Sequence, residues 1–136
     1  MDAGQRLFSC VSHEIEVSVT PTFIEQRSDP DIDMYFWAYE VTIQNLGAAT
    51  VQLKSRYWHI TDASGLVNEV RGPGVVGQEP RLGPGEVFEY VSGTPLTTPS
   101  GIMVGSYFMQ TDDGAMLEVA IPAFSLDSPY DHVTLN

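Results

Sequence analysis

The chain has 136 residues, of which 18 are Asp or Glu and six are Lys or Arg, so its formal net charge is −12. This length predicts one domain, and a hydrophobic content of 43% excludes a disordered acidic tail. The scarcity of cations excludes a protein held to nucleic acid or to anionic membranes mainly by charge neutralisation.

The cellular compartment is predicted from cysteine content and hydropathy. Cys10 is the only cysteine in the sequence, so no intrachain disulfide can form, which fits a reducing compartment. No segment approaches the roughly 20 apolar residues needed to span a bilayer. The first 20 residues also lack the apolar core of a signal peptide. We therefore expect a cytoplasmic protein.

The first two strongly periodic segments are typical of half-buried β-strands. In residues 14–20, apolar side chains alternate with polar ones. In residues 35–44 the odd-numbered positions are aromatic or aliphatic, and their aromatic side chains are expected in the core. These odd positions are Tyr35, Trp37, Tyr39, Val41 and Ile43.

The next segment, residues 51–60, changes phase along its length. Val51 and Leu53 share one parity, whereas Trp58 and Ile60 have the other. This change predicts a β-bulge near positions 55–56. A turn at residues 62–65 and a short strand at residues 66–71 should follow.

Glycine and proline dominate residues 72–85, which hold five Gly and three Pro. Proline removes ladder donors and glycine weakens strands, so this segment is predicted to be largely loop. A strand is expected at residues 87–91, and a second loop at 92–101 because of Pro95 and Pro99. Two more strands, at 102–111 and 115–121, flank Asp113-Gly114, a strong hairpin signal.

These segments together predict the fold class. About seven strands without a convincing helix indicate an all-β protein, an antiparallel β-sandwich, with a small barrel as the alternative. We expect one domain over residues 13–128, a flexible N-terminal segment at 1–12 and a C-terminal tail at 129–136.

A glycine motif at residues 72–77 has the spacing of the dinucleotide-binding fingerprint. That fingerprint requires a helix directly after the glycines, which Pro80 and Pro84 exclude. The remaining hypothesis is an anion nest of backbone amides that binds a nucleotide or polyphosphate, and the alternative is a tight structural loop. The residues of the binding hypothesis are Gly72, Gly74 and Gly77 with Arg56, Arg71 and Arg81.

Three alternating aspartates mimic a calcium-loop spacing. Asp29, Asp31 and Asp33 precede Glu40, which stands at the twelfth position of such a loop. The sixth position requires glycine but holds Met34, so an EF-hand is excluded. Loose divalent-cation binding by these aspartates and a merely solvated acidic loop remain as alternatives.

Nothing in the sequence assembles a catalytic site. His13, His59 and His132 are far apart and lack metal-ligand spacing, and a packed or hydrogen-bonded role fits His59 better than catalysis. Cys10 has no obvious activating partner. We therefore expect no enzyme, no catalytic residues and no cofactor.

The basic residues are unevenly distributed. Four of the six lie in residues 54–81 together with three acids, so this segment has a net charge of +1 and the remainder carries −13. If the fold gathers these cations, they form the one surface suited to an anionic ligand or an acidic partner.

Several segments resemble one known family. They are 56–62 (Arg-Tyr-Trp-His-Ile-Thr-Asp), the glycine motif at 72–77, Thr-Pro-Ser-Gly at 98–101 and Ile-Pro-Ala-Phe-Ser-Leu at 121–126. Over about residues 13–128 the chain resembles the ApaG (CorD) family. The resemblance implies a fibronectin type III-like (immunoglobulin-like) sandwich and a bacterial protein associated genetically with cobalt resistance and magnesium efflux. Related domains in F-box proteins and a DNA polymerase δ-interacting protein imply a protein-binding role.

We therefore expect a non-enzymatic binding or adaptor module that recognises a protein partner, connected through the resemblance with cobalt and magnesium homeostasis. The contacts would come from strand edges or from the glycine loop with Arg71 and Arg81. Edge strands also allow pairing with a second copy as a homodimer. Nucleotide binding through the glycine loop is the alternative, and neither nucleic acid nor a membrane is expected as a partner.

Overall fold

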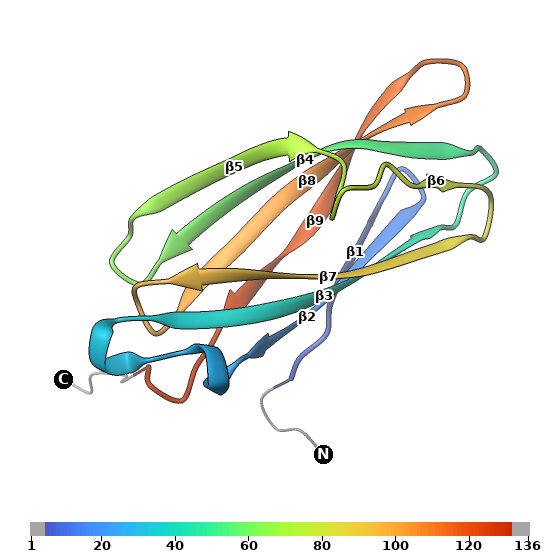
Figure 1. Ribbon diagram of the computed structural model, residues 1–136. Coiled ribbons are helices and arrows are strands. Elements are labelled where there is room, and N and C mark those ends of the chain that lie inside the picture. The colour runs from blue at the N-terminus through green and yellow to red at the C-terminus, as the bar shows by residue number, and fades with distance from the viewer. Residues whose placement is uncertain (1–4, 132–136) are drawn as a thin grey trace.

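Strands dominate the structure because apolar and polar residues alternate through almost every segment (Figure 1). The computed structural model describes residues 5–131. Two short 3-10 turns, η1 (Glu25–Arg27) and η2 (Pro30–Ile32), separate the second and third strands. The strands are β1 (Phe8–Ser12), β2 (Ile15–Phe23), β3 (Tyr35–Asn45), β4 (Val51–Asp62), β5 (Val67–Pro73), β6 (Arg81–Leu82), β7 (Val87–Leu96), β8 (Gly101–Thr111) and β9 (Met116–Leu126).

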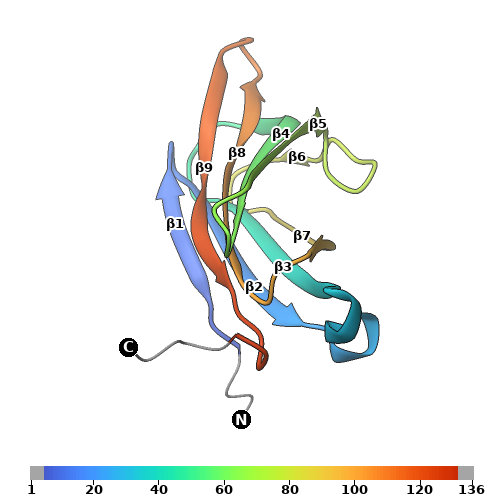
Figure 2. The same cartoon turned by 90° about the vertical axis from the view of Figure 1, so that its left-hand side faces the viewer.

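The strands form two antiparallel sheets that face each other (Figures 1 and 2). One sheet has the order β1-β2-β3-β7, and the other has the order β5-β4-β8-β9 with β6 also paired to β4. The predicted sandwich is confirmed, and the barrel alternative is wrong because the sheets remain separate. No helix within residues 5–131 is long and apolar enough to cross a bilayer.

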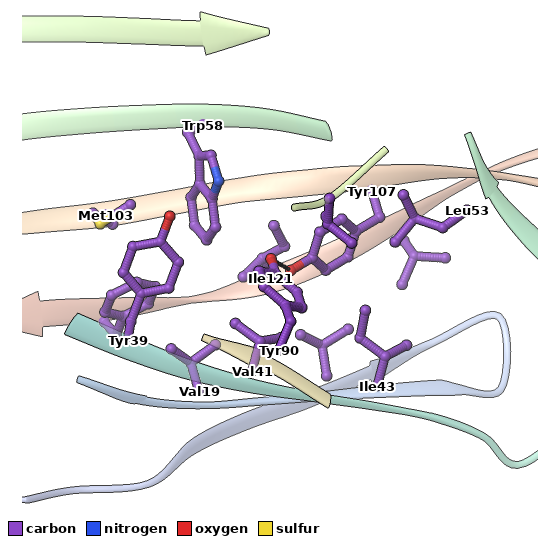
Figure 3. Close-up of a cluster of buried hydrophobic side chains, with 14 of the residues drawn as sticks. Val19, Tyr39, Val41, Ile43, Leu53, Trp58, Tyr90, Met103, Tyr107 and Ile121 are labelled. Atoms are coloured by element: carbon purple, nitrogen blue, oxygen red, sulfur yellow. Dashed lines mark hydrogen bonds between the residues drawn. The ribbon is translucent and has the colours of Figure 1, made fainter. Parts of the chain in front are cut away.

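The core lies between the sheets and consists of the alternating inward residues of both (Figure 3). The odd-numbered aromatics of β3, Tyr35, Trp37 and Tyr39, are buried as expected. Tyr39 packs with Trp58 of the opposite sheet at a ring-centroid distance of 5.4 Å, and both contact Phe124. Full burial of a large apolar side chain contributes about 1.5–3 kcal/mol to the free energy of unfolding. Contacts between these rings therefore stabilise the packing of one sheet against the other.

The phase change in β4 is a β-bulge, as predicted. The pairing of β4 with β8 shifts between Leu53 and Ser55, which leaves Lys54 as the extra residue. Because of this shift, Trp58 and Ile60 face the core together with Leu53. The same shift turns Arg56 toward the space between the sheets and Tyr57 outward.

The N-terminal boundary differs from the expectation of a flexible segment at 1–12. Phe8–Ser12 forms β1, which pairs with β2 in the register Cys10↔Val17. Side chains also join it to β9, because the Cys10 thiol donates to the Ala120 carbonyl (3.4 Å) and the Ala120 amide donates to Ser12 Oγ (2.9 Å). β1 is ordered by its contacts with β2 and β9. Its own short sequence does not reveal these contacts.

The expected loop at 92–101 is also corrected, since β7 continues to Leu96. Gly93 is accommodated in the strand because the Phe36 ring occupies the place of its missing side chain, 2.3 Å from where a Cβ would lie. Pro95 is tolerated because β7 is an edge strand with β3 as its one sheet neighbour in the described chain. The strand after the Asp113-Gly114 hairpin likewise continues further than expected, to Leu126.

The C-terminal tail, expected from residue 129, begins with an ordered contact. The Tyr130 ring packs 5.9 Å from the Phe23 ring, and its hydroxyl donates to Glu25 Oε2 at 2.5 Å. This contact attaches the chain after β9 to the far end of β2. Residue 130 therefore belongs to the folded domain.

The two lateral sides of the sandwich differ (Figure 2). On one side β1 lies against β9, which closes the space between the sheets. On the other side lie β5 and β7, each bordered by a single sheet neighbour within residues 5–131. We call the β5/β7 side the open side.

Candidate functional site

Two cavities lie along the open side. The first, which we call the arginine pocket, has a volume of about 400 Å³ and is lined by Tyr39, Arg56, Trp58, Gly77, Tyr90 and Ser92, among others. The second, which we call the apolar groove, has a volume of about 670 Å³ and is lined mainly by Ile32, Met34, Ile60, Leu66, Val67 and Leu96. Both volumes fall in the range of ligand-binding clefts.

Arg56 reaches across the arginine pocket to the glycine loop. Its Nη1 donates to the carbonyls of Pro73 and Gly74, each at 3.0 Å. Gly72 lies opposite Arg56 in the β4–β5 register, and a Cβ there would lie only 3.0 Å from Nη1. Glycine at position 72 therefore leaves the space that the guanidinium occupies. Within the described chain no carboxylate lies within ion-pair distance of Arg56.

Buried tyrosines lie on the core side of the arginine pocket. Tyr39 and Tyr90 line the pocket and are only 5% and 8% exposed. The Tyr90 hydroxyl is hydrogen-bonded to that of Tyr107, a fully buried residue (Figure 3). Burial raises the pKa of all three phenols, and the positive charge of Arg56 lowers each pKa in part. At neutral pH they are therefore uncharged and can donate hydrogen bonds.

Three amides in the glycine loop are bonded within the chain. The Gly74 amide donates to the Lys54 carbonyl at 2.9 Å, and the amides of Val75 and Gln78 each donate to the other's carbonyl at 2.8 Å. Gly74 has a φ of +58°, and a Cβ there would lie 2.2 Å from the Gln78 carbonyl oxygen. Since these three amides already have acceptors, they are not available to an anion nest.

The structure does not bring the three predicted arginines into one site. Arg71 lies on the outer face of β5, where its guanidinium stacks over the Tyr57 ring at 4.4 Å and lies 3.6 Å from Glu69. Arg81, on β6, pairs with Asp112 at 2.5 Å. Arg56 alone faces the space between the sheets. Arg71 pairs with Tyr57, the neighbour of Arg56, and neighbouring positions on a strand face opposite sides of the sheet, so Arg71 and Arg56 lie on different faces.

The three aspartates lie around η2. Asp29 caps this turn, its Oδ1 accepting from the Asp31 amide at 3.2 Å, and Asp33 follows with a φ of +52°. Across residues 5–131, no three His, Cys, Asp or Glu side chains are grouped so as to hold a metal ion. His59 lies on β4, His13 lies in the β1–β2 turn, and His132 is outside the described residues.

Sequence reasoning missed Tyr39, Tyr90 and Ser92 as companions of Arg56. The predicted bulge held a signal for Arg56. When the change of phase comes before residue 56, Arg56 and Trp58 have the same parity and face the same side of β4. Since Trp58 was expected to be buried, Arg56 could have been predicted to face inward. Its tyrosine partners come from β3 and β7, whose position opposite β4 follows from the sheet order and not from local periodicity.

The apolar groove exposes hydrophobic side chains beside the free edge of β5. Ile32 and Leu66 are 64% and 69% exposed, and Met34 and Val67 are exposed as well. They come from η2, the residue before β3, the β4–β5 turn and the start of β5, and they meet at one end of the open side. Contiguous exposed apolar side chains are typical of interaction surfaces.

Comparisons with known proteins point to one family. A family model described as the ApaG domain matches residues 25–111. Protein ApaG from Parvibaculum lavamentivorans is 60% identical over 124 residues, which cover 91% of this chain and 95% of that protein. Protein ApaG from Brucella anthropi is 56% identical over 130 residues, covering 96% of this chain and 100% of that protein.

A solved structure shows the same architecture. A crystal structure described as an ApaA protein from Bordetella pertussis superposes with a TM-score of 0.83 at 46% sequence identity. The match covers 91% of this chain and 99% of that chain. The similarity therefore covers most of the chain.

Proposed function

Because the chain belongs to the ApaG domain family, we propose that it is a non-enzymatic cytoplasmic adaptor that binds an extended segment of another protein along β5. The observation that carries this proposal is the free edge of β5 beside the apolar groove. Family resemblance to domains with an inferred protein-binding role supports the same class of function.

The strand β5 offers an unpaired backbone edge. It pairs with β4 on one side, and no strand of residues 5–131 pairs with its other side. Six of its seven residues are exposed. Exposed strand edges present amides and carbonyls that a further strand can pair with, so an extended polypeptide is the natural occupant.

The second free edge on this side is less suited to pairing. Pro95 removes a backbone donor from β7, whereas β5 contains no proline before Pro73, its last residue. Residues expected from the sequence to contact a partner also border the β5 edge. Arg71 lies on β5, and Arg81 lies on β6, which continues the same side of β4.

The apolar groove would select among extended segments. A segment added to β5 alternates its side chains between two faces, so one face can place apolar side chains in the groove. Asp33 and Asp62 also line the groove, and the chain carries a net charge of −12. A segment with apolar residues and flanking Lys or Arg would therefore complement this surface.

Capture of the partner from the host, with crosslinking and mass spectrometry, tests this function. Leu66→Glu introduces a charge into the groove at an exposed position and should release the partner while the fold is kept. Leu46→Glu is the matched control, because Leu46 is also an exposed leucine but lies in the turn at the opposite end of β4. Identical captured proteins for both variants would reject the proposed surface.

A second copy of the chain is the other occupant that such an edge could take. Light scattering across a concentration series distinguishes the two, since self-pairing through β5 would give a dimer that Leu66→Glu disrupts. The proposal predicts that the protein stays monomeric and that the captured partner is a different chain.

The connection with cobalt and magnesium is part of this proposal through the family resemblance, with the bound partner as the component that handles the cation. Calorimetry with magnesium and cobalt checks whether the chain itself takes part. The wild type and the Asp29, Asp31 and Asp33 triple Asn variant should give the same heats. Cation binding that the triple variant loses would contradict this assignment.

A further inference from the structure

The arginine pocket is a second feature of the open side, separate from the edge of β5. It lies between the sheets, and its chemistry differs from that of the apolar groove, since a guanidinium and several hydroxyl groups converge in it. Lys54, Arg71 and Arg81 are each paired with a carboxylate, but Arg56 is held only by two backbone carbonyls. The Arg56 charge is therefore available to a ligand.

The donors of the pocket suit an anion. Arg56 uses Nη1 for the glycine loop, and its other guanidinium nitrogens donate to no acceptor in the described chain. Tyr39 and Ser92 contribute hydroxyl groups from β3 and β7, on the sheet opposite Arg56. These groups are placed by strands β3, β4 and β7, and Tyr39 is buried, so the site is formed before any ligand arrives.

The walls of the pocket restrict the class of anion. Trp58 and the side chains of Val75 and Val76 provide an aromatic and aliphatic surface next to the single charge. A dianion such as phosphate would leave one negative charge uncompensated among buried, neutral phenols in a chain of net charge −12. The amides of Gly74, Val75 and Gln78 are bonded internally and would not supply the missing donors.

We infer that the arginine pocket binds a singly charged organic carboxylate with a flat apolar body, its carboxylate on Arg56 and its body against Trp58. Guanidinium and carboxylate match in geometry, and a carboxylate can also accept hydrogen bonds from Tyr39 and Ser92. The pocket volume of about 400 Å³ accommodates a one-ring acid. A free acid and an acidic side chain on a bound protein share this chemistry.

The test is a titration followed by amide chemical shifts, with benzoate as the probe and benzamide as its neutral analogue. Benzoate should give saturable shifts at Tyr39, Gly77 and Ser92 at concentrations up to about 20 mM, in the range of weak millimolar ligands. Benzamide should bind at least about tenfold more weakly, because it lacks the charge that Arg56 pairs with. Equal shifts for both probes, or no saturation with benzoate, would overturn the inference.

Variants separate ligand binding from the structural role of Arg56. Arg56→Gln should weaken benzoate binding by about tenfold or more, and Tyr39→Phe by about threefold to tenfold, since in the described chain the Tyr39 hydroxyl makes no hydrogen bond to the glycine loop that its loss could disturb. Arg71→Gln, on the outer face of β5, should leave binding within about twofold of wild type. Unchanged affinity in both Arg56→Gln and Tyr39→Phe would contradict the site.

Two further experiments test phosphate binding as the alternative and show whether the carboxylate comes from a free acid or from a protein side chain. Tighter saturable binding of inorganic diphosphate than of benzoate would assign the loop to phosphate recognition and overturn the inference. A peptide carrying one central glutamate, compared with its glutamine analogue, shows whether an acidic side chain enters as benzoate does. Leu66→Glu should leave benzoate binding unchanged, so failure of this site and failure of partner binding along β5 are distinguishable.

Discussion

Arg56 and Gly72 depend on each other, because the Arg56 guanidinium occupies the space that a side chain at position 72 would need. The guanidinium lies over Gly72 and donates to the carbonyls of the following loop. A side chain at position 72 would meet the guanidinium, while loss of Arg56 would leave two carbonyls without this donor. The pair thus links the geometry of the glycine loop to the arginine pocket.

Gly72→Ala should destabilise the protein by about 1 kcal/mol, because the added Cβ would lie 3.0 Å from Arg56 Nη1 and must shift the guanidinium relative to its two carbonyl acceptors. Urea denaturation measures this change. On an Arg56→Ala background the same substitution should cost much less, since the displaced group is absent. Equal costs on both backgrounds would show that Gly72 is required for another reason.

The buried pair Tyr90 and Tyr107 should make the protein sensitive to alkali. Burial raises both pKa values above 10, so in strong alkali the unfolded chain loses these protons before the folded chain does. The stabilising effect is complete below pH 10 and falls above it by about 1.4 kcal/mol per pH unit for each tyrosine. The free energy of unfolding, measured by urea titration from pH 8 upward, should follow this course.

The Phe variants provide the control for this prediction. Tyr90→Phe leaves the fully buried Tyr107 hydroxyl without its partner and should cost about 1–3 kcal/mol at neutral pH. The double Phe variant should cost less than the sum of the two single variants and should flatten the alkaline decline. A decline of the same steepness in the double variant would assign alkali sensitivity to other groups.

At the scale of elements, the bulge in β4 decides what faces the core. Lys54 is the additional residue between Leu53 and Ser55. This insertion determines which of the following side chains face the core. Without it, either Trp58 and Ile60 turn outward or the pairing with β8 must shift throughout. A one-residue change of register inverts a whole strand face.

Deletion of Lys54 should therefore abolish cooperative folding or reduce stability by more than about 4 kcal/mol, as for other disruptions of a core. Lys54→Ala should cost at most about 1 kcal/mol, because it removes only a surface ion pair with Glu79. Circular dichroism during urea denaturation compares the two variants. Comparable stabilities would show that the bulge does not determine the facing of β4.

The elements that sequence patterns predicted are ordered by the local alternation of apolar and polar residues. The elements that the patterns missed are ordered by contacts with other strands. The bulge and the odd-numbered aromatics of β3 follow from local alternation, which the sequence displays directly. β1 is ordered by its neighbours β2 and β9, and β7 extends through Gly93 and Pro95 because it is an edge strand over Phe36. For the site, Arg56 was identified, but it was grouped with Arg71 and Arg81, which lie elsewhere.

At the scale of the whole molecule, the charge of −12 surrounds an open side with one inward-facing arginine and one apolar groove. The segment 54–81, with a net charge of +1, does not form a continuous basic surface, because three of its four cations are paired with carboxylates. The acidic bulk should therefore dominate the approach of a partner.

Partner binding is accordingly expected to weaken with salt. A segment with flanking Lys or Arg is attracted by the acidic surface over a Debye length of about 8–10 Å at 0.1–0.15 M salt. Capture at about 0.05 M and 0.5 M sodium chloride checks this, with a loss expected at the higher concentration. Capture that strengthens with salt would indicate a purely apolar contact without charge complementarity.

The most direct test of the account is photo-crosslinking in the host from single positions on the surface. A photoreactive residue at position 66 or 69, beside or on β5, should crosslink one partner protein to this chain. The same residue at position 46, at the opposite end of β4, should not crosslink that partner. Crosslinks at position 46 but not at 66 or 69 would contradict binding along β5.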